Sequence, residues 1–158
     1  MSSKRGFTVI EIMIVVTIIG LLATLAVPHF RKIRRRARNA VFINNLRILS
    51  DSVFEQYAIE NGGYPADAPP GVIPAGIQPY MARRVHWEEG TPIGGQWNWD
   101  RGATRTDKIN GVYASIEAVG VSRTADQMRE LDGEFDDGNL LTGMFRQTPT
   151  GYMQIMEH

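Results

Sequence analysis

Four carboxylates lie close together near the C-terminus: Asp132, Glu134, Asp136 and Asp137. Carboxylates at alternate positions of a turning loop can converge on calcium, which binds roughly six to eight oxygen ligands. The spacing of an EF-hand loop is not met, because the glycine comes one position late and no glutamate occupies the last ligand position. Two interpretations therefore stay open, a calcium site and a solvated acidic turn.

Another carboxylate, Glu11, is the only charged residue in the apolar run 7–27, which reads FTVIEIMIVVTIIGLLATLAV. As a helix this run is about 31 Å long, which matches a hydrocarbon core of about 30 Å. It is too long for the apolar region of a secretory signal peptide, so we expect a membrane anchor. A carboxylate costs free energy in lipid. Glu11 is therefore either functional or close enough to the headgroups to stay hydrated.

A short basic leader that ends in glycine precedes the apolar run, and residues 4–11 read KRGFTVIE. This junction resembles that of type IV prepilins and pseudopilins. The resemblance implies that a prepilin peptidase cleaves between Gly6 and Phe7 and that the new terminal amine of Phe7 is methylated. It also implies that Glu11 faces the Phe7 ammonium of a neighbouring subunit and sets the axial register. Two opposite charges in an apolar bundle offset their desolvation cost only when they are paired.

Pro28 ends the apolar run and matches the helix-kinking proline of the same family, so we expect the helix to bend or melt locally there. Six basic residues follow: Arg31, Lys32, Arg34, Arg35, Arg36 and Arg38. A count of flanking cations would place the C-terminal side in the cytoplasm. The resemblance to prepilins implies that it lies outside, and we follow the resemblance. The basic residues are interpreted as a collar that contacts lipid phosphates. They lack partners that could read bases, so no nucleic acid is expected.

The segment 39–61 is predicted to form an amphipathic helix, with apolar residues at spacings of four and three: Phe42, Leu46, Leu49, Val53 and Tyr57. Gly62 and Gly63 provide a stop signal, and Pro65 prevents the helix from resuming. The string 61–65, NGGYP, is similar to an element that follows the long helix in major pseudopilins. The proline-rich segment 64–95 is predicted to be a long surface connection.

Four strands are predicted from alternation and turn signals, at 96–100, 112–119, 143–148 and 152–157. Trp97 and Trp99 share one face of the strand 96–100 and are expected to pack on the amphipathic helix. One face of the strand 112–119 is expected to carry Val112, Ala114, Ile116 and Ala118. Thr124 and Gln127 resemble a capping box that opens a short helix. The predicted fold class is α+β and pilin-like: one long N-terminal helix, half anchor and half amphipathic, on a small antiparallel sheet.

Composition excludes several classes of function. The formal net charge is zero, but eight of the 17 basic residues lie in residues 1–38, and the remainder has a net charge of −7. The chain has no cysteine, which excludes disulfides, thiolate metal sites and a cysteine nucleophile. His29, His86 and His158 are isolated, and no catalytic or phosphate-binding motif occurs. An enzyme is therefore not expected.

The predicted organisation is a leader peptide at 1–6, a transmembrane and polymerisation segment at 7–30, an amphipathic continuation at 31–62 and a head at 63–158. The resemblance implies an inner-membrane, single-pass subunit of a type II secretion pseudopilus, with its head in the periplasm or outside. Its partners would be the prepilin peptidase and N-methyltransferase, related subunits, an assembly platform with its ATPase, and lipid. Two alternatives stay open: a type IV pilus subunit for adhesion, motility or DNA uptake, and an anchored binding domain that never polymerises.

Overall fold

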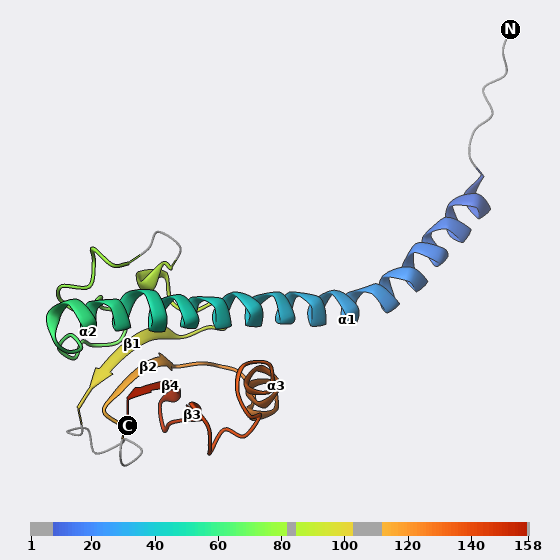
Figure 1. Cartoon of the computed structure of the whole chain (residues 1–158). Coiled ribbons are helices and arrows are strands. Elements are labelled where there is room, and N and C mark those ends of the chain that lie inside the picture. Colours follow the sequence, from blue (N-terminus) through green and yellow to red (C-terminus); the bar gives the residue numbers. More distant parts are fainter. Residues whose placement is uncertain (1–7, 82–84, 103–111, 158) are drawn as a thin grey trace, which may run out of the picture. The chain divides into compact units, whose positions relative to one another are not determined.

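The computed structural model describes residues 8–81, 85–102 and 112–157. A helical stretch begins with α1 (Val9–Arg47), continues as a π-helical segment, η1 (Ile48–Phe54), and ends with α2 (Glu55–Asn61). The chain divides into two compact units, Met1–Ala37 and Arg38–His158. Figure 1 shows the elements of each unit. Because α1 extends across the boundary between the units, the same helix serves first as the apolar segment and then as part of the head.

The N-terminal part of α1 is apolar all round. Among the described residues, one helical stretch, Val9–Asn61, is long and apolar enough to cross a membrane, with a mean hydropathy of 2.6 over its most apolar 18 residues. The hydroxyl groups of Thr17 and Thr24 donate to the carbonyl oxygens of Met13 and Gly20, so neither polar side chain is left unsatisfied. Pro28 lies inside α1, and the helix continues on both sides of it. Local melting at Pro28 is therefore not observed, and a bend there stays a prediction. One missing backbone donor is tolerated within so long a helix.

The head-facing side of the helix contains the predicted apolar stripe and two further buried apolar residues, Ile43 and Phe54. Four residues of the predicted stripe are fully buried or nearly so: Phe42, Leu46, Leu49 and Val53. The fifth, Tyr57, is half-buried. Phe54 is also completely buried, although a period of 3.6 residues places it beside the stripe. The π-helical segment explains this, because its bonds close over five residues, as from the Glu55 N–H to the Ser50 carbonyl. The wider turn brings Val53 and Phe54 together into the core.

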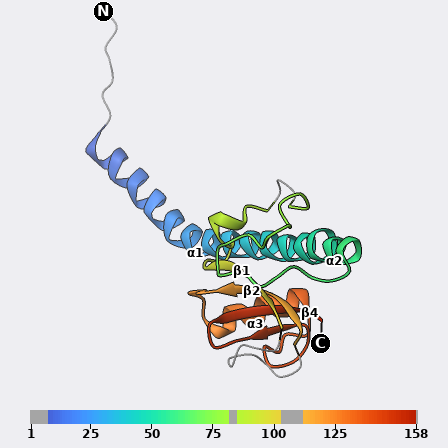
Figure 2. The ribbon, with the colours of Figure 1, turned by 90° about the vertical axis from the view of Figure 1, so that its left-hand side faces the viewer.

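The sheet has four antiparallel strands in the order β1-β2-β4-β3. They are β1 (Gln96–Arg101), β2 (Ala114–Val119), β3 (Phe145–Gln147) and β4 (Gly151–Glu157). Trp97 stacks on Phe42 with ring centroids 5.3 Å apart, and Trp99 stacks on Phe54 at 3.9 Å. Figure 2 shows that, within the unit Arg38–His158, the helical stretch lies over the sheet. The predicted α+β class and the packing of both tryptophans on the helix are confirmed.

The predicted face of the second strand was wrong at one residue. Ala114, Ile116 and Ala118 lie in the main core, whereas Val112 packs in a separate cluster with Met153 and Ile155. β2 begins only at Ala114, and its register with β4 shifts between Ala114 and Ser115. Such an irregularity breaks the two-residue period, so alternation could not be extended back to Val112.

The segment 64–95 is irregular, as predicted, but the interpretation as a surface connection was wrong. Among its described residues, four buried apolar side chains belong to the main core cluster: Ile77, Val85, Trp87 and Ile93. Trp87 opens a short 3-10 helix, η2 (Trp87–Glu89), and its indole N–H donates to the Val72 carbonyl oxygen at 3.0 Å. Its ring stacks on Trp97 with centroids 6.0 Å apart.

The same segment covers the free edge of β1. Ala68 forms an isolated antiparallel bridge with Trp99, and the N–H of Gly71 donates to the Trp97 carbonyl oxygen at 2.7 Å. The outward-facing carbonyl groups of Trp97 and Trp99 are thereby paired.

The predicted short helix is α3 (Ala125–Phe135), and its capping interaction is present. The Thr124 hydroxyl accepts a hydrogen bond from the N–H of Gln127 at 3.4 Å. Met128 and Leu131 face the core and are completely buried. Asp132 is buried beside them, which places a carboxylate at the point where α3 leaves the core.

Candidate functional site

The predicted processing residues Gly6 and Phe7 lie outside the described residues, so the described part of the assembly segment begins at Thr8. The Thr8 hydroxyl and backbone N–H both donate to Oε2 of Glu11, each at 2.8 Å. The N–H of Glu11 donates back to the Thr8 hydroxyl at 3.3 Å. This reciprocal arrangement is a capping box, and it starts α1.

Sequence reasoning missed the role of Thr8, although the spacing T-x-x-E was a usable signal. The cap has a consequence for Glu11. Its carboxylate is held at the helix N-terminus, where backbone N–H groups and the helix dipole favour negative charge. The chain therefore stabilises Glu11 at the edge of an apolar segment before any neighbour contributes.

The apolar side chains that follow Glu11 have no covering layer in the unit to which they belong. Large apolar residues between Val9 and Phe30 are exposed by 50% at Val27 to 78% at Val9. A helix that is apolar all round is stable only in lipid or against other apolar surfaces. This segment is therefore built to be covered by a membrane or by other helices.

A capped, all-round apolar helix continues into the core helix of an α+β domain, which is the arrangement expected of a pilin-like fold. Comparison with known families agrees, since residues 1–27 match the family described as "Prokaryotic N-terminal methylation motif". This match shows that the N-terminal segment of the chain is similar to the N-terminal segment of prepilins.

Curated relatives include both pilins and secretion proteins. The chain is 51% identical over 46 residues to the type IV major pilin protein PilA of Myxococcus xanthus, covering 29% of this chain and 21% of that protein. It is 36% identical over 63 residues to type II secretion system core protein G of Klebsiella michiganensis, covering 40% and 44%. It is 38% identical over 66 residues to the type IV wide pilus major component PilA4 of Thermus thermophilus, covering 40% and 48%. The chain thus spans less than half the length of these relatives. No solved structure matches it.

The second candidate site lies where α3 ends. The structure brings together Asp132, Asp136 and Asp137, with one carboxylate oxygen of each within 4.8 Å of the others. Glu134 is exposed and lies outside this group. The segment was predicted to be a turning loop, but Asp132 to Phe135 belong to α3. Two residues along a helix correspond to a rotation of about 200°, which turns Glu134 away from Asp132.

The two exposed aspartates of the cluster are held by the following loop. Oδ2 of Asp136 accepts hydrogen bonds from the N–H groups of Met144 and of Phe145, the latter at 3.0 Å. Asp137 accepts from the N–H of Asn139 at 2.8 Å through Oδ1 and from the Thr142 hydroxyl at 2.7 Å through Oδ2. These bonds fix both carboxylates beside Asp132.

Gly143 makes this arrangement possible. Its φ of 73° is in the left-handed region, and a Cβ at this position would collide with the Asp136 carboxylate. Only glycine leaves space for that carboxylate to reach the backbone of the next residues.

Asp132 is the unsatisfied member of the cluster. Its side chain is completely buried, and neither oxygen has a hydrogen-bond partner of standard geometry among the described residues. Burial, and then repulsion by Asp136 and Asp137, raises the pKa of Asp132 to about 6, and the nearby Gly138 N–H opposes part of this shift. A buried carboxylate that lacks well-formed hydrogen bonds is costly unless it is protonated or bound to a cation. The cluster offers three hard oxygen donors, out of the roughly six to eight that calcium takes.

Proposed function

We propose that this chain is a structural subunit of a pilin-like filament and that it acts by polymerising. The observation that carries the proposal is the apolar helix of α1, exposed on all sides and opened by the Thr8–Glu11 capping box. Copies of this helix packed side by side would bury the apolar surface that the single chain leaves exposed. Glu11 would then pair with the N-terminal ammonium of Phe7 in a neighbouring copy and set the axial register.

Within that class we propose a type II secretion pseudopilin, which would form a short pseudopilus that moves secreted proteins outward. The similarity to core protein G extends over 63 residues, and the NGGYP string at 61–65 supports the same assignment. A type IV pilus subunit is the second candidate, favoured by the 51% identity to a major pilin over 46 residues. An anchored domain that never polymerises is the third.

The location and partners follow from this proposal. The chain would be a single-pass inner-membrane protein with its head in the periplasm or outside. A prepilin peptidase with N-methyltransferase activity would process it, and an assembly platform with its ATPase would extract it from the bilayer into a filament of related subunits. The relatives reported above are named as pilins and secretion components, so the proposed role is structural and not enzymatic.

Processing is the first test. Intact-mass and N-terminal peptide spectrometry on protein from its native membrane should find a chain that begins at Phe7. The mass should be that of the cleaved chain, or higher by about 14 Da for one methyl group. Gly6→Leu should prevent cleavage, because a bulky side chain would obstruct the bond that glycine exposes. A wild-type chain that still begins at Met1 or Ser2 would remove the filament proposal and leave the anchored domain.

We also propose that Asp132, Asp136 and Asp137 bind calcium and that the ion joins α3 to the loop before β3. The fully buried carboxylate of Asp132, which has no hydrogen bond of standard geometry among the described residues, supports this proposal. Removing calcium with a chelator at pH 7 should lower the melting temperature of the full chain by several degrees. Asp132→Asn should abolish this calcium response, whereas Glu134→Gln, two residues away, should retain it.

The calcium response should also depend on pH. The pKa of Asp132 is raised in the folded state, so the ion-free fold binds its proton more tightly than the unfolded chain does. Its contribution to stability is present at low pH and is lost as the pH rises from about 4 to about 6. Calcium should therefore stabilise the protein more at pH 7 than at pH 5, as measured by thermal unfolding at both values. Equal melting temperatures with calcium and with chelator at pH 7 would show that the cluster is a solvated turn.

A further inference from the structure

The helical stretch carries two segments of opposite charge. The basic segment, residues 31–38, holds six cations, of which five are exposed and Arg35 is half-buried. The acidic segment, residues 51–60, holds three exposed anions: Asp51, Glu55 and Glu60. The centres of the two segments lie roughly 20 residues apart along the chain. Two parallel copies aligned without an offset would place cations against cations and anions against anions, which is unfavourable.

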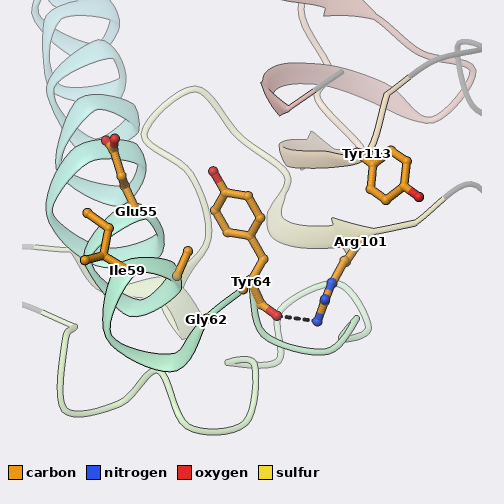
Figure 3. Close-up of a pocket in the computed structure, with 8 residues that line it drawn as sticks. Glu55, Ile59, Gly62, Tyr64, Arg101 and Tyr113 are labelled. Atoms are coloured by element: carbon orange, nitrogen blue, oxygen red, sulfur yellow. Dashed lines mark hydrogen bonds between the residues drawn. The ribbon is translucent and has the colours of Figure 1, made fainter.

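An open hollow adjoins the acidic segment, with a volume of about 540 Å³. Glu55 and Ile59 line it from α2, and Figure 3 shows Tyr113 across from them. Ile59 is 77% exposed and Tyr113 is 59% exposed, so two large apolar side chains border this hollow without being buried. The surface around this hollow therefore carries one anion, Glu55, and two exposed apolar side chains, Ile59 and Tyr113.

The cation in the hollow is already engaged. Arg101 donates from Nη1 to the backbone carbonyl oxygen of Tyr64, drawn as the dashed line in Figure 3. Of the two nearby anions, Asp51 already accepts a hydrogen bond from the Ser50 hydroxyl at 2.6 Å. Glu55 forms no ion pair among the residues that the structure describes. The surface can therefore accept a cation at Glu55.

The basic segment has the complementary composition. Phe30, next to its N-terminal end, is 64% exposed, and Ile33, between the cations, is 50% exposed. Each surface therefore combines apolar side chains with charge, and the two charges are opposite. Long arginine side chains can cover apolar surface with their stems while their heads pair with carboxylates.

We propose that residues 30–38 of one copy dock against Asp51, Glu55, Ile59 and the adjoining hollow of a second, parallel copy. This inference rests on the proposed filament and names a contact within it. The offset of roughly 20 residues is far larger than the four residues between Phe7 and Glu11. The docked copies would therefore be separated by several axial steps of the filament, and not by one.

The absence of native cysteine allows a direct test. The double variant Arg34→Cys/Glu55→Cys should give a ladder of covalent multimers when filaments in native membranes are treated with a short bis-maleimide. Each single variant should give no ladder. Filaments that contain the double variant but give no ladder would overturn the proposal, as expected if Arg34 contacts lipid phosphate instead. Dimers from Arg34→Cys alone would also overturn it, because they require aligned copies.

A charge reversal keeps the proposal testable if the cysteine variant assembles poorly. Asp51→Lys/Glu55→Lys should reduce the yield of sheared filaments at least tenfold. Asp67→Lys/Glu88→Lys makes the same change in net charge at two exposed positions elsewhere on the head and should leave the yield near that of wild type. Equal yields from both variants would overturn the docking proposal while leaving the filament itself intact. A wild-type chain that never assembles would overturn both.

Discussion

Glu11→Ala is expected to abolish filament assembly while the chain still inserts into the membrane. In an apolar bundle, removing one partner of a buried ion pair leaves the other charge uncompensated, which costs about 3–5 kcal/mol at each contact. The cost recurs at every subunit added, so the loss should be close to complete. The measurement is the amount of sheared filament relative to total membrane-bound protein.

Two further variants separate the charge of Glu11 from its capping role. Glu11→Gln keeps an acceptor for the Thr8 N–H and hydroxyl but removes the charge, so it should fail to assemble as alanine does. Thr8→Ala removes the cap but keeps the charge, and should assemble. Thr17→Ala, in the same helix, is the matched control for a change within the apolar segment. Normal assembly of Glu11→Ala would instead favour an anchored domain whose Glu11 is only hydrated.

Trp99→Ala should produce the largest loss of stability in the head, about 3–5 kcal/mol in the free energy of unfolding. Trp99 is completely buried, and its ring contacts Phe54 at 3.9 Å and Tyr64 at 5.4 Å. Its indole N–H donates to the Pro65 carbonyl oxygen at 3.2 Å. The substitution therefore opens a cavity and leaves that acceptor unpaired at the same time.

Urea unfolding of the full chain in detergent, followed by near-ultraviolet circular dichroism, measures this effect. Tyr113→Ala is the control, because Tyr113 is 59% exposed and its removal should change the free energy of unfolding by less than about 0.5 kcal/mol. A loss below about 1 kcal/mol for Trp99→Ala would mean that the stack on Phe54 does not hold the helix on the sheet.

Elements with a regular period could be predicted from the sequence, and residues outside such a period could not. Trp97 and Trp99 alternate within a strand, so their shared face followed directly from the pattern. Phe54 was missed because the π-helical turn departs from the 3.6-residue period on which the stripe was based. Trp87 was missed because it lies in a three-residue 3-10 helix within an otherwise irregular segment, where burial depends on distant contacts and leaves no periodic signal.

The candidate sites divide in the same way, into residues that a local motif predicts and residues whose position depends on tertiary packing. Gly6, Phe7 and Glu11 follow from a local motif, and the T-x-x-E cap at Thr8 could have been found in the same way. The acidic cluster was anticipated as a group of residue types, but its geometry was not. The burial of Asp132 depends on how α3 packs, and the position of Asp136 depends on the free space over Gly143.

The protection of the sheet edges determines how copies of the head can associate. An open strand edge is a template on which a second chain can add a strand, and repeated addition leads to uncontrolled aggregation. The bridge at Ala68 and the Gly71 hydrogen bond occupy the edge of β1. At the other edge, β3 has only three residues, and the N–H of Gln147 already donates to Leu140 at 2.8 Å. The head is thus guarded against amyloid-like growth, and ordered polymerisation is left to the helix.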